Sequence, residues 1–192
     1  MTGWWWVRHG PTHEKSFLGW RDLPADLSDV ALLARLDATL PRPALVVSSD
    51  LLRARQTADV LGRARSRQPD EPDLREFNFG AWDGQAFHAV SQNDPDLSRA
   101  FWEQPGDVAP PDGESWNTVS TRVSKVVNRL SRAHAGQHIV AVAHIGTIMT
   151  QIARCQNQTS FSAMSHQIDN LSITQIDVYD GKQVLRRVNE TP

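Results

Sequence analysis

The chain has 192 residues, the length of one ordinary domain, and 40% of them are hydrophobic, which is enough for a sizeable core. With 22% charged residues, the composition excludes a wholly disordered or collagen-like chain. The formal net charge is −2, from 20 basic and 22 acidic residues, so bulk charge gives no support for nucleic-acid binding.

Three features of the sequence bear on location. No apolar run approaches the roughly 18 residues that a bilayer span needs, so we expect no membrane insertion. The segment Met1–Arg8 has no basic stretch followed by an apolar one, so no secretory signal is visible. The single Cys155 cannot form an internal disulfide and suits a reducing cytosol. The sequence therefore predicts a cytoplasmic protein.

The first half of the chain predicts two strands around a helix. Trp4–Arg8 is compact and aromatic and runs into a Gly-Pro turn, as a strand does. Apolar residues then recur every three or four positions from Val30 to Leu40, which indicates a helix. Ala44–Ser48 is a short continuous apolar run, typical of a strand covered on both faces.

The second half predicts a long helix, a buried strand and a hairpin. Glu114–Ala133 has helical periodicity, and His138–His144 is another continuous apolar strand. Leu171–Tyr179 alternates apolar and polar residues, and Gln183–Val188 returns as a hairpin or edge strand after a turn at Asp180-Gly181.

Helices that alternate with strands predict an α/β fold, a three-layer α/β/α sandwich with a mostly parallel central sheet. We expect a single domain over residues 1–192, because no repeat or linker divides it. The stretch of about 70–113 is rich in Pro, Asp, Gly and aromatic residues, and we interpret it as an irregular insertion over one sheet edge.

Nitrogen-bearing side chains follow the predicted strands at the edge where α/β proteins bind ligands. Arg8-His9-Gly10 ends the first strand, and His144-Ile145-Gly146 ends the third. Ser48-Ser49-Asp50 ends the second strand and leads within a few residues to Arg53. Cationic and neutral nitrogen donors beside glycine-bearing turns suit an anion, and a phosphoryl group above all.

Four ordered segments carry a family resemblance: Arg8-His9-Gly10-Pro11-Thr12, Ser48–Ala58, Leu74–Gly84 and Val142-Ala143-His144. They resemble, in this order, the first histidine motif, the second arginine segment, the acid-bearing segment and the second histidine segment of the histidine phosphatase (phosphoglycerate mutase-like) superfamily. The resemblance implies a phosphoglycerate mutase-like fold.

The resemblance also implies roles for the basic residues. His9 would attack phosphorus through a neutral ring nitrogen and form a phosphohistidine. Arg8 and Arg53 would bind the phosphoryl oxygens through their planar forks of N–H donors. His144 would donate to the same oxygens, although taken alone it would be interpreted as a buried core histidine. The family pattern selects Arg53 over Arg55, which lies on another side of the predicted helix.

Glu76 is the predicted general acid toward the leaving alkoxide and then the general base for water. Asp73, Asp83 and Glu114 compete for this role. No cluster with metal-ligand spacing is visible and no step needs a metal, so we expect neither a metal nor another cofactor.

Thr12, Gly19 and Ile145, the last through its backbone N–H, are the predicted pocket-lining positions. Glu114 is first interpreted as part of the first turn of the long helix, where a carboxylate complements the helix dipole, and second as a substrate contact. Ile145 stands where the family commonly has Gly or Ala, so its branched side chain should narrow the pocket or shift the loop.

The leading hypothesis is hydrolysis of a small-molecule phosphate ester through a phosphohistidine. A cofactor-dependent phosphoglycerate mutase is the first alternative, but Phe79 stands where those mutases have a Tyr, and we find no cations for a second phosphate in 83–113. A catalytically inactive phosphate-binding regulator is the second. Sugar phosphates, α-ribazole phosphate, phosphoserine-like metabolites and phosphoproteins all fit the predicted phosphate site. We expect a small monoester to be preferred over a bisphosphate, and the oligomeric state, a homodimer included, stays open.

Overall fold

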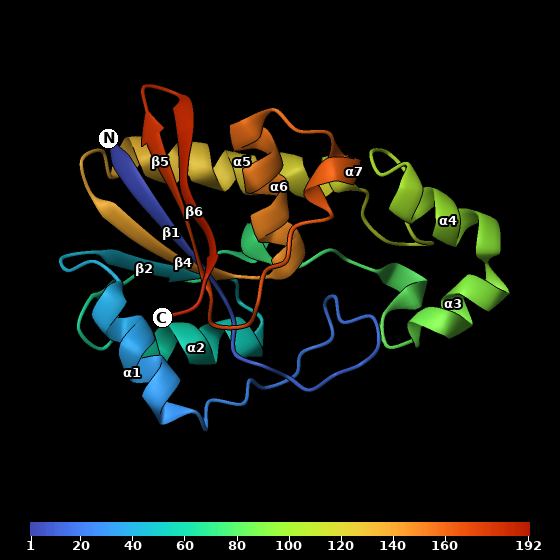
Figure 1. The fold of residues 1–192 in the computed structure, drawn as a ribbon, viewed down its shortest axis with the longest axis horizontal. Helices are drawn as coiled ribbons and strands as arrows, with labels where there is room; N and C mark the ends of the chain where they lie inside the picture. The colour runs from blue at the N-terminus through green and yellow to red at the C-terminus, as the bar shows by residue number, and fades with distance from the viewer.

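The central sheet of the protein is mixed and has six strands in the order β3-β2-β4-β1-β5-β6. The computed structural model describes all 192 residues (Figure 1). The strands are β1 (Thr2–Arg8), β2 (Leu45–Ser48), β3 (Ser66–Arg67), β4 (His138–Ala143), β5 (Ile173–Tyr179) and β6 (Lys182–Glu190). The first four strands of the order pair in parallel, whereas β5 is antiparallel to both β1 and β6.

Helices cover both faces of this sheet, which gives the predicted three layers. The α-helices are α1 (Val30–Thr39), α2 (Leu52–Gly62), α3 (Phe87–Asn93), α4 (Pro95–Glu103), α5 (Trp116–Ala133), α6 (Ile145–Gln156) and α7 (Ser160–Ala163). In Figure 1, α1 and α2 lie below the sheet, α5 and α6 lie above it, and α3 and α4 extend to the right. None of these helices is long and apolar enough to cross a bilayer.

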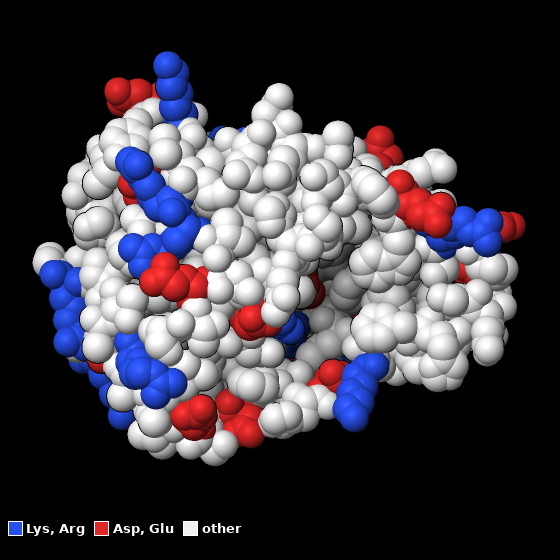
Figure 2. All heavy atoms as spheres, viewed as in Figure 1, with Lys and Arg blue, Asp and Glu red and all other residues white.

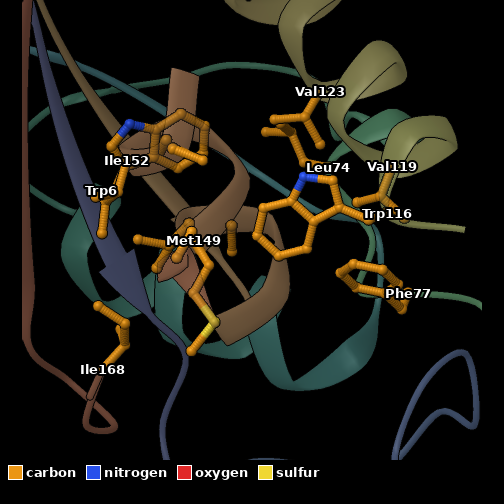
Figure 3. Close-up of a cluster of buried hydrophobic side chains, with 14 of the residues drawn as sticks. Trp6, Leu74, Phe77, Trp116, Val119, Val123, Met149, Ile152 and Ile168 are labelled. Carbon is orange, nitrogen blue, oxygen red and sulfur yellow. The ribbon is translucent and has the colours of Figure 1, made fainter. Parts of the chain in front are cut away.

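The alternation of side chains along β1 divides the core in two. Trp4 and Trp6 are buried on the face covered by α5 and α6, whereas Val7 is buried on the face covered by α1 and α2. Figure 3 shows the first of these cores, where Trp6, Met149 and Trp116 converge from β1, α6 and α5. Side chains of β2 and β4 are therefore mostly buried whichever way they point, as the continuous apolar runs predicted.

Two helices begin at the side chains that cap them. Asp29 accepts a hydrogen bond from the backbone N–H of Leu32 and begins α1. Ser115 accepts from the N–H of Thr118 and begins α5, so the expectation that Glu114 belongs to the first turn of this helix is wrong. A serine cap outcompetes the glutamate because its short side chain reaches the free N–H groups of the first turn.

The stretch of about 70–113 is less irregular than expected. It contains two 3₁₀ turns, η1 (Pro72–Leu74) and η2 (Gly80–Trp82), as well as α3 and α4. These helices have no more than nine residues, and aromatic packing holds them. Phe101 of α4, for example, lies edge-on to Trp82 with ring centroids 5.5 Å apart.

We predict that Leu36→Ala lowers the free energy of unfolding by about 2–5 kcal/mol, because Leu36 of α1 is fully buried and the smaller side chain leaves a cavity. Val30→Ala in the same helix is the control and should change it by less than about 0.5 kcal/mol, since Val30 is 72% exposed. Urea unfolding followed by circular dichroism measures both. Equal effects would contradict this description of the α1 interface.

Candidate active site

Parallel pairing of β1 with β4 brings two histidines together. Arg8 lies opposite Ala143 in the ladder, and both strands end there. The backbone N–H of His9 donates to the carbonyl of Ala143 at 3.1 Å, so His9 and His144 are the next residues on neighbouring strands. Their ring centroids lie 5.0 Å apart.

The hydrogen bonds of His9 define its tautomer. Nδ1 lies 2.7 Å from the carbonyl oxygen of Gly10, which can only accept, so Nδ1 carries the proton. Nε2 accepts from Nε of Arg53 at 3.2 Å and therefore holds a lone pair. Burial is the main cause that lowers the pKa of His9 well below 6.5, and the charges of Arg53 and Arg8 lower it further. His9 is thus a neutral imidazole with a nucleophilic Nε2.

Arg53 lies in the first turn of α2, fully buried beneath His9, whereas Arg55 faces solvent. Besides the bond to His9, its two terminal nitrogens donate to the carbonyls of Arg21 at 2.9 Å and Gly19 at 2.7 Å. A guanidinium has five N–H donors, so two remain for a ligand. The preference for Arg53 over Arg55 therefore agrees with its position in the fold.

Arg8 is half-buried at the end of β1 and supplies a second cation. Its Nη1 donates to the carbonyl of Ile168 at 2.6 Å, but its buried Nε has no partner. Burial lowers the pKa of Arg8 from its usual value, against the nearby carboxylates of Glu76 and Asp169. A guanidinium stays charged in proteins, so this one has unused donor capacity beside His9.

His144 is fully buried, and neither ring nitrogen has a hydrogen-bond partner. Its pKa also lies well below 6.5, first because of burial and then because of the charges of Arg53 and other neighbours. Buried polar nitrogens are nearly always paired in proteins, and these two unpaired nitrogens belong to a ring beside His9, which lines a cavity; that position indicates a ligand-binding role.

Glu76 supplies a buried carboxyl group to the same site. One oxygen accepts from its neighbour Phe77 N–H at 2.9 Å and the other from Gly146 N–H at 3.1 Å. Burial raises the pKa of Glu76 from its usual value and outweighs these two bonds, which favour the ionised form. Gly146 is required here, because a Cβ at this position would lie 2.4 Å from the carboxylate and 2.5 Å from the ring of Phe77.

A cavity of about 320 Å³ lies beside His9, and its lining includes Arg8, His9, Thr12, Glu76 and Ile145. Figure 2 shows a hollow to the right of the centre, between the sheet and the side that carries α3 and α4. No group of three or more His, Cys, Asp or Glu side chains has the geometry to hold a metal ion. The arrangement combines a neutral imidazole with a lone pair on Nε2, two guanidinium groups and a carboxyl group with a raised pKa.

The sequence model described as the histidine phosphatase superfamily (branch 1) matches residues 4–191. The chain belongs to this superfamily. The match confirms the resemblance of the four ordered segments and, together with the solved structures below, the predicted phosphoglycerate mutase-like fold.

Relatives of this family member include a bifunctional protein of Mycobacterium tuberculosis, 32% identical over 176 residues, which cover 91% of this chain and 46% of that protein. The chain thus spans about half the length of the curated relatives that it matches first. The adenosylcobalamin/alpha-ribazole phosphatase of Salmonella typhimurium is 28% identical, with 96% of this chain and 95% of that protein covered.

Solved structures of other proteins superpose on nearly the whole length of this chain. YhfR of Bacillus stearothermophilus has a TM-score of 0.89 and 25% identity, with coverage of 100% and 98% of the two chains. A mycobacterial glucosyl-3-phosphoglycerate phosphatase in complex with VO3 has a TM-score of 0.84 and 26% identity, with 98% of each chain covered.

Only some of the predicted pocket-lining residues face the cavity. Thr12 and Ile145 line it. Gly19 is not among the lining residues; its carbonyl accepts from Arg53, and a Cβ there would lie 2.5 Å from the carbonyl oxygen of Phe77. Gly19 therefore lets two loops approach closely around Arg53.

Glu114 also lies outside this cavity, and its carboxylate is engaged elsewhere. One oxygen accepts from the backbone N–H of Asn78, and both accept from Arg122 at 2.8 Å. Arg122 in turn donates to the carbonyls of Asp73, Arg75 and Glu76. The pair of Glu114 and Arg122 therefore holds the segment that carries Glu76.

Sequence reasoning missed three residues that position the site. Arg122 is one, and nothing in its helical pattern distinguishes it. Asn170 donates to the carbonyl of His9 at 2.8 Å from a loop 161 residues away, which no local signal could reveal. Thr57 accepts from Gly10 N–H and donates to the Arg53 carbonyl. Its spacing of one helical turn from Arg53 is the signal that could have found it.

We predict that the imidazoles of His9 and His144 stay neutral at pH values well below 6.5, with the His9 proton on Nδ1. Both burial and neighbouring cations disfavour the imidazolium, so both pKa values are lowered. Long-range ¹H–¹⁵N NMR of the imidazole nitrogens measures the titration, with each ring identified in a His→Asn variant. Titration of either ring at 6.5 or above in the folded protein would contradict the site described above, and the urea-unfolded protein is the control.

Proposed function

We propose that this chain is a metal-independent phosphomonoester hydrolase that acts through a phosphohistidine on His9. The observation that carries the proposal is the juxtaposition at one sheet edge of a neutral His9 and an unpartnered His144, with two guanidinium groups around them. A phosphoryl group has charge on all its equatorial oxygens, and fixed cations and N–H donors stabilise that charge throughout transfer.

In the first step, the Nε2 lone pair of His9 attacks phosphorus in line with the ester oxygen. An N–P bond forms while the ester P–O bond breaks, and its electron pair leaves on the alkoxide oxygen. Glu76 gives its proton to that oxygen, so an alcohol departs. The raised pKa of the Glu76 carboxyl favours the protonated form that this step needs.

In the second step, water attacks the phosphohistidine. The Glu76 carboxylate takes one proton from water, the new P–O bond forms, and the N–P bond returns its electron pair to Nε2 of His9. Inorganic phosphate leaves and Glu76 is protonated again. Arg8, Arg53 and the N–H of His144 bind the phosphoryl oxygens in both steps, and the hydrogen bond to the Gly10 carbonyl keeps the His9 ring oriented.

A small organic monoester is the substrate that these groups favour. Besides His9, the titratable side chains lining the cavity are Arg8, Glu14 and Glu76. Arg8 is proposed to bind the transferred phosphoryl group, so no cation of the cavity lining remains for a second phosphate. A phosphoglycerate mutase or a polyanionic substrate would require such a cation. The phosphatases among the relatives are named after different organic phosphates, so family membership alone does not choose the substrate.

We predict that His9→Ala lowers the turnover of p-nitrophenyl phosphate by more than about 1000-fold, because the nucleophile is lost. Acid-quenched wild type incubated with a ³²P-labelled monoester should carry label that is labile in acid and stable in alkali, as an N–P bond is.

The exposed His88 on α3 provides the control, and His88→Ala should keep both turnover and labelling. EDTA should leave wild-type turnover unchanged. If His9→Ala retains wild-type turnover, the proposed mechanism is wrong. If the wild-type protein binds phosphate or vanadate but turns over no ester, the catalytically inactive regulator is favoured.

We predict that Glu76→Gln slows the release of alkyl alcohols by about 10²–10⁴-fold, because the alkoxide then leaves without a proton donor. With p-nitrophenyl phosphate, whose leaving group needs no proton, the variant should release a burst of p-nitrophenol equal to the enzyme concentration and then turn over slowly. Stopped-flow absorbance measures the burst. Glu103→Gln, at an exposed position of α4, is the matched control, and equal slowing of both substrates without a burst would refute the acid–base role.

A further inference from the structure

A second, apolar cavity of about 230 Å³ adjoins the one that holds His9. We call it the apolar compartment and define it by Phe79, Trp102, Ile145, Met149 and Met164, which line it from the η2 region, α4, α6 and the end of α7. Of its ten lining residues eight are hydrophobic, and the two others are Glu76 and Gly146. Figure 3 shows Met149 beside Trp116 and Phe77, which form the buried end of this compartment.

The two cavities share lining residues around the proposed acid. Glu76, Phe79, Trp102 and Ile145 line both of them. The phosphoryl group is proposed to lie on the His9 side of Glu76, and the leaving oxygen must lie within hydrogen-bond reach of the Glu76 carboxyl. The carbon skeleton attached to that oxygen therefore begins where the apolar compartment opens.

The size and surface of the compartment match a ring. An engineered apolar cavity of about 150 Å³ binds benzene, so the larger compartment here can hold a benzene-sized ring or a somewhat larger group. Trp102 is 42% exposed and Met164 is half-buried, so apolar side chains at the opening remain accessible to a ligand. Thioether and aromatic side chains together favour contact with aromatic rings.

The rim of the His9 cavity offers no free cation to a second anionic group. Glu14 lines this cavity and pairs with Arg21 at 2.7 Å. Its hydrogen bonds to Arg21 and to nearby backbone and hydroxyl groups lower its pKa to about 2, so it is ionised at neutral pH and the two charges offset each other. A second phosphate or carboxylate would therefore gain no cation here, whereas an apolar ring turned toward α6 and α7 gains apolar contact.

We propose that the apolar compartment binds the organic part of the substrate, and that this part is an aromatic or similarly apolar ring carried on the phosphate ester. The inference rests on the proposed function, since it places the leaving group by the position of Glu76. Ile145 would then be a specificity residue, because it lines both the cavity of the phosphoryl group and that of the ring.

The experiment compares benzyl phosphate with 2-hydroxyethyl phosphate. Both release a primary alkoxide, so chemical reactivity is similar and the difference reports the binding of the ring. We expect kcat/KM for benzyl phosphate to be about 10- to 100-fold higher, mainly through a lower KM, because burial of a ring contributes to ground state and transition state alike.

Met164→Gln tests the compartment itself, because Met164 lines it and is not among the residues lining the His9 cavity. A polar amide in place of the thioether should reduce the benzyl-to-hydroxyethyl ratio of kcat/KM at least about fivefold, since the ring loses apolar contact. Trp102→Ala should also reduce the ratio. Phe161→Ala on α7, 59% exposed and lining neither cavity, is the matched control and should keep the wild-type ratio.

A binding measurement separates this inference from the proposed hydrolysis. Benzylphosphonate and 2-hydroxyethylphosphonate cannot be hydrolysed, and calorimetry gives their dissociation constants for wild type and for each variant that folds. Tighter binding of benzylphosphonate, weakened by Met164→Gln, supports the proposed role of the compartment even if neither ester is hydrolysed. The absence of hydrolysis would then contradict only the proposed hydrolytic function. Hydrolysis of both esters with equal kcat/KM, or equal affinity for both phosphonates, would overturn the inference and leave the hydrolytic function intact.

Discussion

The parallel pairing of β1 with β4 is the interaction on which the rest of the site depends. In register, the ladder ends at Arg8 and Ala143, so the next residue on each strand is a histidine at the same sheet edge. A shift of one residue would turn every side chain of the strand to the opposite face and separate the two rings. The register is held by the cores on both faces of the sheet, so the packing of tryptophans far from the cavity also sets the spacing of the histidines.

The second constraint is the burial of ionisable side chains at this sheet edge. Burial disfavours the charged forms of His9, His144 and Glu76: it lowers the pKa values of the two histidines and raises the pKa of the glutamate. The buried Arg53 keeps its charge because backbone carbonyls of two loops accept its hydrogen bonds. The basic groups are thus in place without a ligand, and the unpaired Nε of Arg8 and one N–H of the neutral His144 ring remain as free donors.

The sequence marked β1, β2, β4, the hairpin of β5 and β6, α1 and α5, but it marked neither β3 nor α3, α4, α6 and α7. Continuous apolar runs marked β2 and β4, and the spacing of three and four marked α1 and α5, because burial on two faces or on one stripe leaves a periodic record. The two short helices α3 and α4 lie in a stretch rich in Pro, Asp and Gly, and aromatic contacts with distant segments hold them, such as Trp82 with Phe101 and Phe17 with Trp102. Glu114 was expected in the first turn of α5, but the adjacent Ser115 caps this helix and Glu114 pairs with Arg122, about two turns further along.

The sequence by itself determined the α/β class, the family and the grouping of Arg8, Arg53 and His144 with His9, because strand ends and ordered motifs are local features of the chain. Only the tertiary structure decided what surrounds those residues. The carbonyls that hold Arg53, the arginine that holds the Glu76 segment and the apolar compartment behind Glu76 come from loops and helices far apart in sequence. Contacts of this kind depend on how whole layers pack, and packing across layers has no periodic signature along the chain.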